Sequence, residues 1–280
     1  FVMIRRPPGS TRSGTLLPYS TLVRSDPAAA DALAGNQLVQ AETLLRQHLQ
    51  RAPSDSAAMR MLAEVAARLG RHEDAENLLA RCLELAPGFH AARQNYALVL
   101  YRGNQPARAL EEVERLLGTD AYNPSYRNLK AVILGRIGDY GRAIELFSAL
   151  LAEYPNNAKI WLSQGHALKT ANRRDEAIAA YRRSIALDPG FGEAWWSLAN
   201  LKTFRFESAD LDAMRAQLAR GELDDNQRLQ FEFALGKALE DARDYERSFE
   251  HYAEGNRLRR AMVPYSAGQN AARVRRATQL

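Results

Sequence analysis

The sequence predicts an all-α protein, a right-handed α-solenoid in which antiparallel helix pairs stack one on another. Small residues return every 34 positions, in two series. The first series is Ala41, Ala75, Ala109, Ala143 and Ala177, and the second is Ala63, Ala97, Ala131, Gly165 and Ala199. A helix-ending proline returns at the same interval, at Pro53, Pro87, Pro155 and Pro189. No segment alternates apolar and polar residues over a useful length, so no sheet is expected.

The two small-residue series indicate where helices cross. A methyl group or a hydrogen atom lets two helix backbones approach, whereas larger side chains would hold them apart. Larger residues recur one helical turn after the first series and are expected to fill the space between pairs. These are Leu45, Leu79, Val113, Phe147 and Tyr181. Residues that tolerate a left-handed backbone recur in the turn inside each pair, at Gly70, Asn104, Gly138 and Asn172.

This interval resembles that of the tetratricopeptide repeat, a helix-turn-helix unit of about 34 residues. Residues 1–21 lack helical periodicity and are expected to form a poorly ordered arm. Tetratricopeptide repeats are then expected over 22–206, as five whole repeats and the first helix of a sixth. The whole repeats are expected at 22–55, 56–89, 90–123, 124–157 and 158–191.

The register of the repeats breaks in the sixth repeat. Leu211 stands where an alanine is expected, and Ser208 is a candidate N-cap for a helix outside the register. The pattern resumes near Gly236. The expected segments are therefore an inserted helix at 207–228, a final repeat at 229–262, and a C-terminal cap or linker at 263–280.

Composition sets limits on location and redox chemistry. Hydrophobic residues make up 46% of the chain, but no run approaches the roughly 18 apolar residues of a membrane helix. The first 20 residues contain no apolar stretch suited to a signal peptide, so a cytoplasmic location and no membrane partner are expected. The single cysteine, Cys82, excludes an intrachain disulfide. It falls in the repeat position of Leu116, Leu150 and Ser184, so a buried structural thiol is expected.

Motifs for catalysis fail at named residues. His72 opens like a zinc-binding helix, but Glu76 stands where the second histidine is needed. Gly236 and Lys237 end like a phosphate-binding loop, but Ala238 replaces the hydroxyl residue that would hold magnesium. We therefore expect no catalytic residue, no metal site and no cofactor in this chain.

Binding is expected on the inner surface, which the first helix of every pair lines. Arg68, Arg102 and Arg136 stand 34 positions apart, and Lys169 lies one residue short of the next rung. They could grip an acidic, phosphorylated or sulfated chain with guanidinium groups. Alternatively, each stabilises the negative C-terminal end of its helix by about 0.3–1 kcal/mol. Both interpretations can hold together.

Four more residues are candidates for peptide contact on this surface: Asn95, His166, Trp196 and Asn200. Trp196 is preferred to Trp195 because Trp195 takes the packing register. The expected partner is a protein or peptide, acidic if the basic residues are used, and a homodimer is a further interpretation. Nucleic acid is disfavoured because the basic residues are interspersed with acids and no aromatic platform interleaves them.

Three segments go beyond a generic repeat: Gly192–Phe206, Phe233–Asp241 and Tyr245–Asn256. Together they resemble the end of the repeat half of bacterial tetratricopeptide-repeat sulfotransferases, and the resemblance covers roughly residues 22–280. It implies that a catalytic domain with a phosphosulfate-binding loop follows the repeats. No such loop occurs in this sequence.

Two hypotheses for function follow. In the first, this chain is a non-catalytic interaction scaffold, the substrate-positioning or dimerising arm of a sulfotransferase. In the second, it is a stand-alone adaptor that binds a peptide in its concave groove. The interruption at 207–228 favours the first hypothesis, because a helix diverted from the stack could dock on a following domain.

Overall fold

The structure is a computed structural model, in which residues 27–263 and 267–278 are described. These residues form 15 helices and no strand, as the all-α prediction requires. In chain order they are α1 (Pro27–Ala34), α2 (Leu38–Arg51), α3 (Ser56–Arg68), α4 (His72–Leu85), α5 (His90–Arg102), α6 (Pro106–Thr119), α7 (Pro124–Ile137), α8 (Tyr140–Glu153), α9 (Ala158–Thr170), α10 (Arg174–Leu187), α11 (Gly192–Ala199), α12 (Ser208–Ala219), α13 (Asp225–Asp241), α14 (Tyr245–Met262) and α15 (Ala267–Ala277). None of these helices is long and apolar enough to cross a membrane. The expected arm at 1–21 lies outside the described residues.

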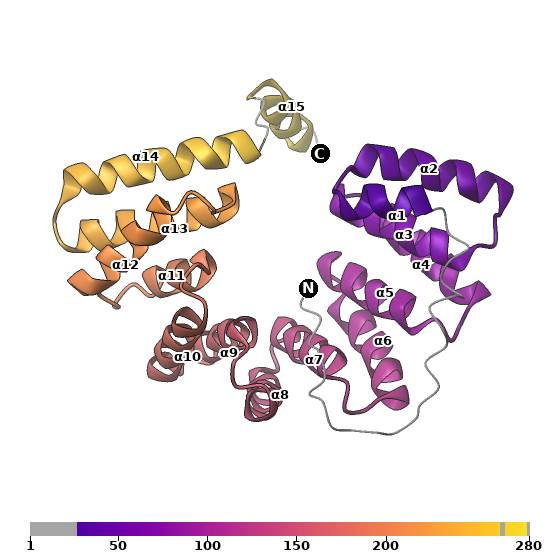
Figure 1. Cartoon of the computed structure of the whole chain (residues 1–280), viewed down its shortest axis with the longest axis horizontal. Coiled ribbons are helices and arrows are strands. Elements are labelled where there is room, and N and C mark those ends of the chain that lie inside the picture. The colour runs from indigo at the N-terminus through magenta and orange to yellow at the C-terminus, as the bar shows by residue number, and fades with distance from the viewer. Residues whose placement is uncertain (1–26, 264–266, 279–280) are drawn as a thin grey trace. The chain divides into compact units, whose positions relative to one another are not determined.

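The helices belong to two compact units (Figure 1). Unit 1 contains α1 to α8 and ends at Glu153, and unit 2 contains α9 to α15 and begins at Tyr154. In unit 1, α3 packs on α4, α5 on α6 and α7 on α8, and each pair also packs on the next. In unit 2, the strongest pairings are α9 with α10 and α13 with α14. Each unit is therefore a stack of helix pairs.

The turns inside the pairs carry the predicted left-handed residues. Gly70, Asn104, Gly138 and Asn172 have φ values of 76°, 60°, 103° and 62°. Asn36, 34 residues before Gly70, has a φ of 58° and extends the series to the first pair. These positive φ values confirm the prediction. A left-handed backbone lets the chain reverse directly after a helix ends.

The predicted packing positions are buried in every pair. The first alanine series is fully buried, and of the second series Ala63, Ala97 and Ala131 are too. The larger residues one turn later are at most 2% exposed. Cys82, Leu116, Leu150 and Ser184 share one repeat position and are also fully buried, so the prediction for Cys82 is confirmed.

Three of the four repeat-ending prolines are tied to the next repeat by a side-chain donor. Trp161 Nε1 donates to the carbonyl oxygen of Pro155 over 2.8 Å, and Trp195 Nε1 donates to that of Pro189 over 3.0 Å. Arg93 donates to Pro87 in the same way, again six residues on. Trp195 is buried, and its indole N–H is used by this bond, so the side chain has a packing role.

The helix that leaves the repeat register, α12, is fastened inside unit 2. Its N-cap is Glu207, whose backbone N–H donates to Asp210 Oδ2 over 3.0 Å, and Ser208 is the first helical residue. The prediction of Ser208 as the N-cap was therefore wrong by one residue. The reciprocal hydrogen bonds of a capping box join Glu207 and Asp210, which makes Glu207 the N-cap. Asp210 also pairs with Arg182 of α10, and Met214 is fully buried where α12 packs on α13.

Candidate functional site

Each unit has its own candidate site on its first-helix face, by which we mean the solvent-facing sides of α3, α5 and α7 in unit 1 and, separately, those of α9, α11 and α13 in unit 2. Within unit 1, α3 contacts α5 and α5 contacts α7. Within unit 2, α11 contacts α13. Side chains at the same repeat position on neighbouring first helices therefore lie side by side.

The predicted basic residues of unit 1 occupy the last turns of their helices and are exposed. Arg68 donates to the carbonyl oxygen of Leu33 in α1 over 3.3 Å and to Glu64 Oε1 over 2.6 Å. Arg136 donates to Asn104 Oδ1 over 3.2 Å, in the turn after α5. Arg68 thus reaches the first helix of the preceding repeat, and Arg136 reaches the turn that follows it. The capping interpretation had placed both guanidinium groups at the end of their own helix.

Arg102 differs from its two neighbours. No hydrogen bond or ion pair joins its exposed guanidinium to another residue in the described part of the chain. Lys169 is likewise exposed, in the last turn of α9 in the other unit. Of the basic series, Arg102 is therefore the member of unit 1 most open to a ligand.

Polar side chains accompany these residues on α5 and α7. Asn95 is half-buried on α5. Asn128, on the next first helix α7, has a buried Oδ1 with no hydrogen-bond partner among the described residues. A buried acceptor without a partner has lost its hydrogen bond to water and gained none in return. A hydrogen-bond donor of a ligand would therefore pair with this oxygen at little further desolvation cost.

On the first-helix face of unit 2, His166 forms a small polar cluster. Its Nδ1 lies 3.0 Å from the Tyr181 hydroxyl, and its Nε2 lies 3.7 Å from Glu193 Oε1. Burial, with a contribution from the charge of Glu193, raises the pKa of Tyr181 far above its usual range. The hydroxyl therefore stays neutral and bonds Nδ1 of the imidazole, while Nε2 lies near the carboxylate of the partly exposed Glu193.

Trp196 is half-buried on α11, and its ring centroid lies 5.3 Å from that of Phe233 on α13. Unlike Trp161 and Trp195, it has an indole N–H without a partner in the described structure. Asn200, the C-cap residue of α11, is exposed. The structure thus presents an aromatic pair, the Trp196–Phe233 pair, with a free donor.

Sequence reasoning missed Phe233 as the partner of Trp196. Each is the fifth residue of its repeat if those repeats begin at Gly192 and Leu229. The inserted helix α12 shifts the interval between them, so a search at a fixed period of 34 does not align the two rings.

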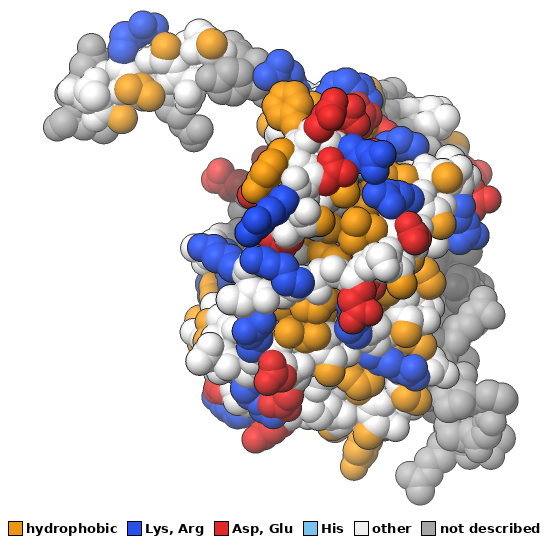
Figure 2. All heavy atoms as spheres, turned by 90° about the vertical axis from the view of Figure 1, so that its left-hand side faces the viewer, with side chains coloured by type: hydrophobic (Ala, Val, Ile, Leu, Met, Phe, Trp, Pro, Cys, Tyr) orange, Lys and Arg blue, Asp and Glu red, His pale blue; other side chains and the backbone are white. Residues whose placement is uncertain are grey.

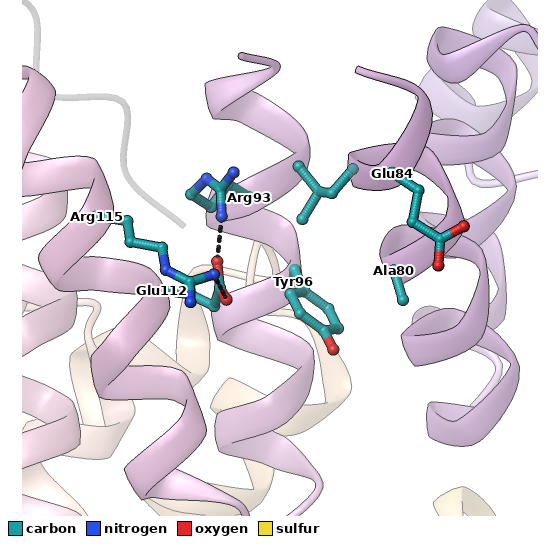
Figure 3. Close-up of a pocket in the computed structure, with 7 residues that line it drawn as sticks. Ala80, Glu84, Arg93, Tyr96, Glu112 and Arg115 are labelled. Carbon is teal, nitrogen blue, oxygen red and sulfur yellow. Dashed lines mark hydrogen bonds and ion pairs between the residues drawn. The ribbon is translucent and has the colours of Figure 1, made fainter. Parts of the chain in front are cut away.

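An open pocket of about 320 Å³ lies between α4, α5 and α6 of unit 1 (Figure 3). Its lining residues are Ala80, Leu83 and Glu84 of α4, Arg93 and Tyr96 of α5, and Glu112 and Arg115 of α6. Glu112 bridges Arg93 over 2.5 Å and Arg115 over 2.7 Å. Because these charges satisfy one another, the pocket offers no unpaired ion to a ligand.

The described residues contain no cluster of metal-ligating side chains, since no three His, Cys, Asp or Glu side chains gather there as a metal site would need. Figure 2 shows acidic, basic and apolar side chains interspersed on one side of the molecule, without a broad field of one sign. The arrangement suits recognition of another chain by a few directed contacts.

Comparisons with known proteins agree with this geometry. A family model for the tetratricopeptide repeat matches residues 32–84, 66–133 and 138–201, more than half of the chain. A tetratricopeptide repeat protein from Parabacteroides merdae has a similar structure, with a TM-score of 0.61 at 16% identity, over 89% of this chain and 94% of that one.

Two relatives of similar sequence are peroxisomal targeting signal receptors. The receptor of Eremothecium gossypii is 28% identical over 207 residues, which are 68% of this chain and 35% of the receptor. That of Kluyveromyces lactis is 27% identical over 214 residues, which are 68% of this chain and 36% of the receptor. The chain spans about a third of the length of these relatives. The family match and the stacked helix pairs together assign the chain to the tetratricopeptide repeat family.

Proposed function

We propose that this chain is a non-catalytic protein–protein interaction scaffold that binds a peptide segment on its first-helix face. The observation that carries the proposal is the Trp196–Phe233 pair, half-buried on unit 2, with an indole N–H that no described residue uses. Tryptophan is enriched at the few interface positions that dominate binding energy. An apolar or aromatic side chain of the peptide would pack on this pair.

Unit 1 supports the polar part of the proposal. Arg102 carries an unpaired charge, and Asn95 and Asn128 present amide groups on the neighbouring stretch of the same face. Amides recognise a peptide backbone through paired donors and acceptors. An acidic residue of a segment bound on unit 1 would be recognised by Arg102.

The relatives favour a peptide ligand. The names of these two relatives state that they are receptors for a peroxisomal targeting signal. We extend only the class of ligand to this chain, a segment of another protein. A cytoplasmic location remains part of the proposal.

The first test selects peptide ligands from a random peptide library displayed on phage and measures their affinity by fluorescence anisotropy. Trp196→Ala is expected to weaken binding by at least about 10-fold, the usual effect at a dominant interface residue. Trp196→Phe retains an aromatic ring against Phe233 but lacks the N–H donor and is smaller, so it is expected to weaken binding less than Trp196→Ala. Tyr122→Ala changes a residue that is 84% exposed and outside the site, so it serves as the control. Equal affinity for all variants would refute the proposal.

The acidic character of the ligand has its own test. Arg102→Glu is expected to select against acidic peptides, and the triple replacement of Arg68, Arg102 and Arg136 by Glu to do so more strongly. Arg183→Glu on α10 is the matched control, because this arginine is also exposed and makes no ion pair within the described residues. If acidic peptides bind all variants equally, the basic series has no part in recognition.

A role as the arm of a sulfotransferase is a second candidate. The segment that contains Trp195 and Trp196 favours it by resemblance, but α12 is accounted for by its contacts within unit 2. The native reading frame beyond Leu280 tests it. A strand followed by a phosphosulfate-binding loop would support the arm, and an immediate stop codon would leave the adaptor.

A further inference from the structure

Helix α14 presents two large aromatic side chains to solvent. Tyr245 is 64% exposed and Phe249 is 73% exposed. They stand four residues apart, so they lie on one side of the helix, one turn after the other. The opposite side packs on α13 through the buried residues Ser248, Gly255 and Leu258. Two exposed aromatic rings in succession on a helix at the end of a stack call for an explanation.

In earlier repeats, the equivalent position on the second helix contacts the next repeat. Phe249 follows Ser248, which occupies the position of Ala41 and Ala75 in earlier repeats. The residues after those alanines, Glu42 and Glu76, bind the next repeat. Glu42 pairs with Arg71 over 2.7 Å, and Glu76 pairs with Arg108 over 2.7 Å. Phe249 therefore occupies a stacking position that faces no further helix pair in the described structure.

The helix that follows does not cover the two rings. In α15, every side chain that is described is exposed except that of Ala272, which is half-buried. Figure 1 places α15 beyond the C-terminal end of α14, whereas Tyr245 and Phe249 belong to the first turns of α14.

The charges along α14 are divided between its ends. Glu246 and Glu250 are exposed near the N-terminal end, and Arg259 and Arg260 are exposed near the C-terminal end. None of the four has an ion-pair partner among the described residues, whereas Arg257 pairs with Glu254 and Arg247, near the acidic end, pairs with Asp244. A helix that is acidic at one end and basic at the other is complementary to an antiparallel copy of itself.

We propose that two copies of this chain associate through α14, antiparallel about a two-fold axis near Ala253. The acidic end of each copy then lies beside the basic end of the other. Tyr245 and Phe249 pack against Asn256 and Arg260 of the second copy. An arginine over a tyrosine ring adds a cation–π contact, and the aromatic side chains leave water. This contact is independent of the peptide-binding face and goes beyond the proposed function.

The test measures the mass of the full chain by light scattering and sedimentation at concentrations up to about 100 μM, which covers weak specific dimers. The wild type is expected to be a dimer. Phe249→Glu is expected to raise the dimer dissociation constant by at least about 10-fold, whereas Tyr122→Glu leaves it unchanged. A wild type that is monomeric throughout, or a Phe249→Glu variant that dimerises like the wild type, overturns the proposal.

Charge reversal tests the antiparallel arrangement. The variants Glu246→Lys/Glu250→Lys and Arg259→Glu/Arg260→Glu change only exposed residues, and circular dichroism verifies their fold. Each alone is expected to be monomeric, and an equimolar mixture is expected to form a heterodimer. Arg275→Glu/Arg276→Glu on α15 is the control and stays dimeric. Folded variants that do not pair when mixed, or that each dimerise alone, overturn the antiparallel contact.

Discussion

The ring of Tyr181 fills the space beside Gly165 so closely that a methyl group on this glycine would lie 2.4 Å from Tyr181 Cε1. Sixteen positions separate the two residues, as they separate Ala63 from Leu79 and Ala97 from Val113. The last helix pair repeats the arrangement, since a methyl group on Gly236 would lie 2.9 Å from Tyr252 Cδ1. Where the second helix contributes a tyrosine, the first helix therefore carries a glycine.

We expect Gly165→Ala to destabilise the protein by about 1–3 kcal/mol, the usual cost of overpacking a core. Gly135→Ala on α7 is the control, because nothing lies within 4 Å of the added methyl group. That control gains up to about 1 kcal/mol of helix propensity. Urea unfolding measures both.

The double variant Gly165→Ala/Tyr181→Leu reproduces the combination of Ala63 and Leu79. It is expected to recover part of the lost stability, although it gives up the bond between Tyr181 and His166. A Gly165→Ala variant as stable as Gly135→Ala would show that the ring can move aside.

The Cys82 thiol is expected to react slowly in the folded protein. It is fully buried, and it donates to the carbonyl oxygen of Ser56 over 3.2 Å. Burial raises the pKa of the thiol, so the reactive thiolate is scarce at neutral pH. We expect a thiol-specific disulfide reagent to react at least about 100-fold more slowly with the native chain than with the chain in guanidinium, since reaction requires opening of the fold.

A cysteine placed at exposed Ala179, in a chain that also carries Cys82→Ser, provides the reference rate for an accessible thiol. The serine is expected to be tolerated. Ser184 occupies the same repeat position and donates to the carbonyl oxygen of Ala158 over 2.8 Å, again 26 residues back. Equal rates for Cys82 and the surface thiol would contradict its burial.

The repeat allowed much of the fold to be predicted, because a residue that serves one helix pair must serve the next. The left-handed turns at Gly70 and Asn104 and the buried position of Cys82 follow from spacing alone. Contacts that occur once do not follow from spacing. The bond from Arg68 to the carbonyl oxygen of Leu33 has no counterpart that a period could indicate. The pairing of Trp196 with Phe233 was hidden by the helix inserted between them.

We expect Asp55 to make the unfolding free energy of the protein depend on pH in the acidic range. Its Oδ1 accepts hydrogen bonds from the backbone N–H groups of Ala57 and Ala58 at the start of α3, and its Oδ2 lies 2.8 Å from His48 Nε2. Burial raises the pKa of the carboxyl group, but the bonds from Ala58, His48 and Ala57 outweigh it and hold the pKa below its usual value. Loss of the cap in Asp55→Ala is expected to cost about 1–2 kcal/mol at neutral pH.

Because the folded pKa of Asp55 is lowered, its charge stabilises the protein above the unfolded value of about 4 and ceases to do so as the pH falls through the folded value. Asp55→Asn keeps a capping oxygen and cannot titrate. The difference in unfolding free energy between the wild type and Asp55→Asn should therefore shrink as the pH falls below about 4. A difference that grows over that range would contradict this account.

The ion pair between Arg182 and Asp210 is expected to hold α12 in place. Burial raises the pKa of Asp210, but hydrogen bonds from Arg182 and from the Glu207 N–H outweigh it and keep the carboxylate charged. The side chain of Arg182 is 36% exposed and that of Asp210 is 12% exposed, so the ion pair is partly buried. Asp210→Ala is expected to cost about 1–3 kcal/mol, between the values for exposed and buried pairs.

The effect should be local to α12, and hydrogen exchange measures it. In Asp210→Ala, amides of residues 208–219 are expected to exchange about 10-fold faster or more, while those of α13 and α14 keep their rates. Asp212→Ala is the matched control, because this carboxylate on the same helix is 75% exposed and pairs only with Arg215. If Asp210→Ala leaves α12 protected, the buried side chain of Met214 and not the ion pair fixes this helix. In that case Met214→Ala should release it.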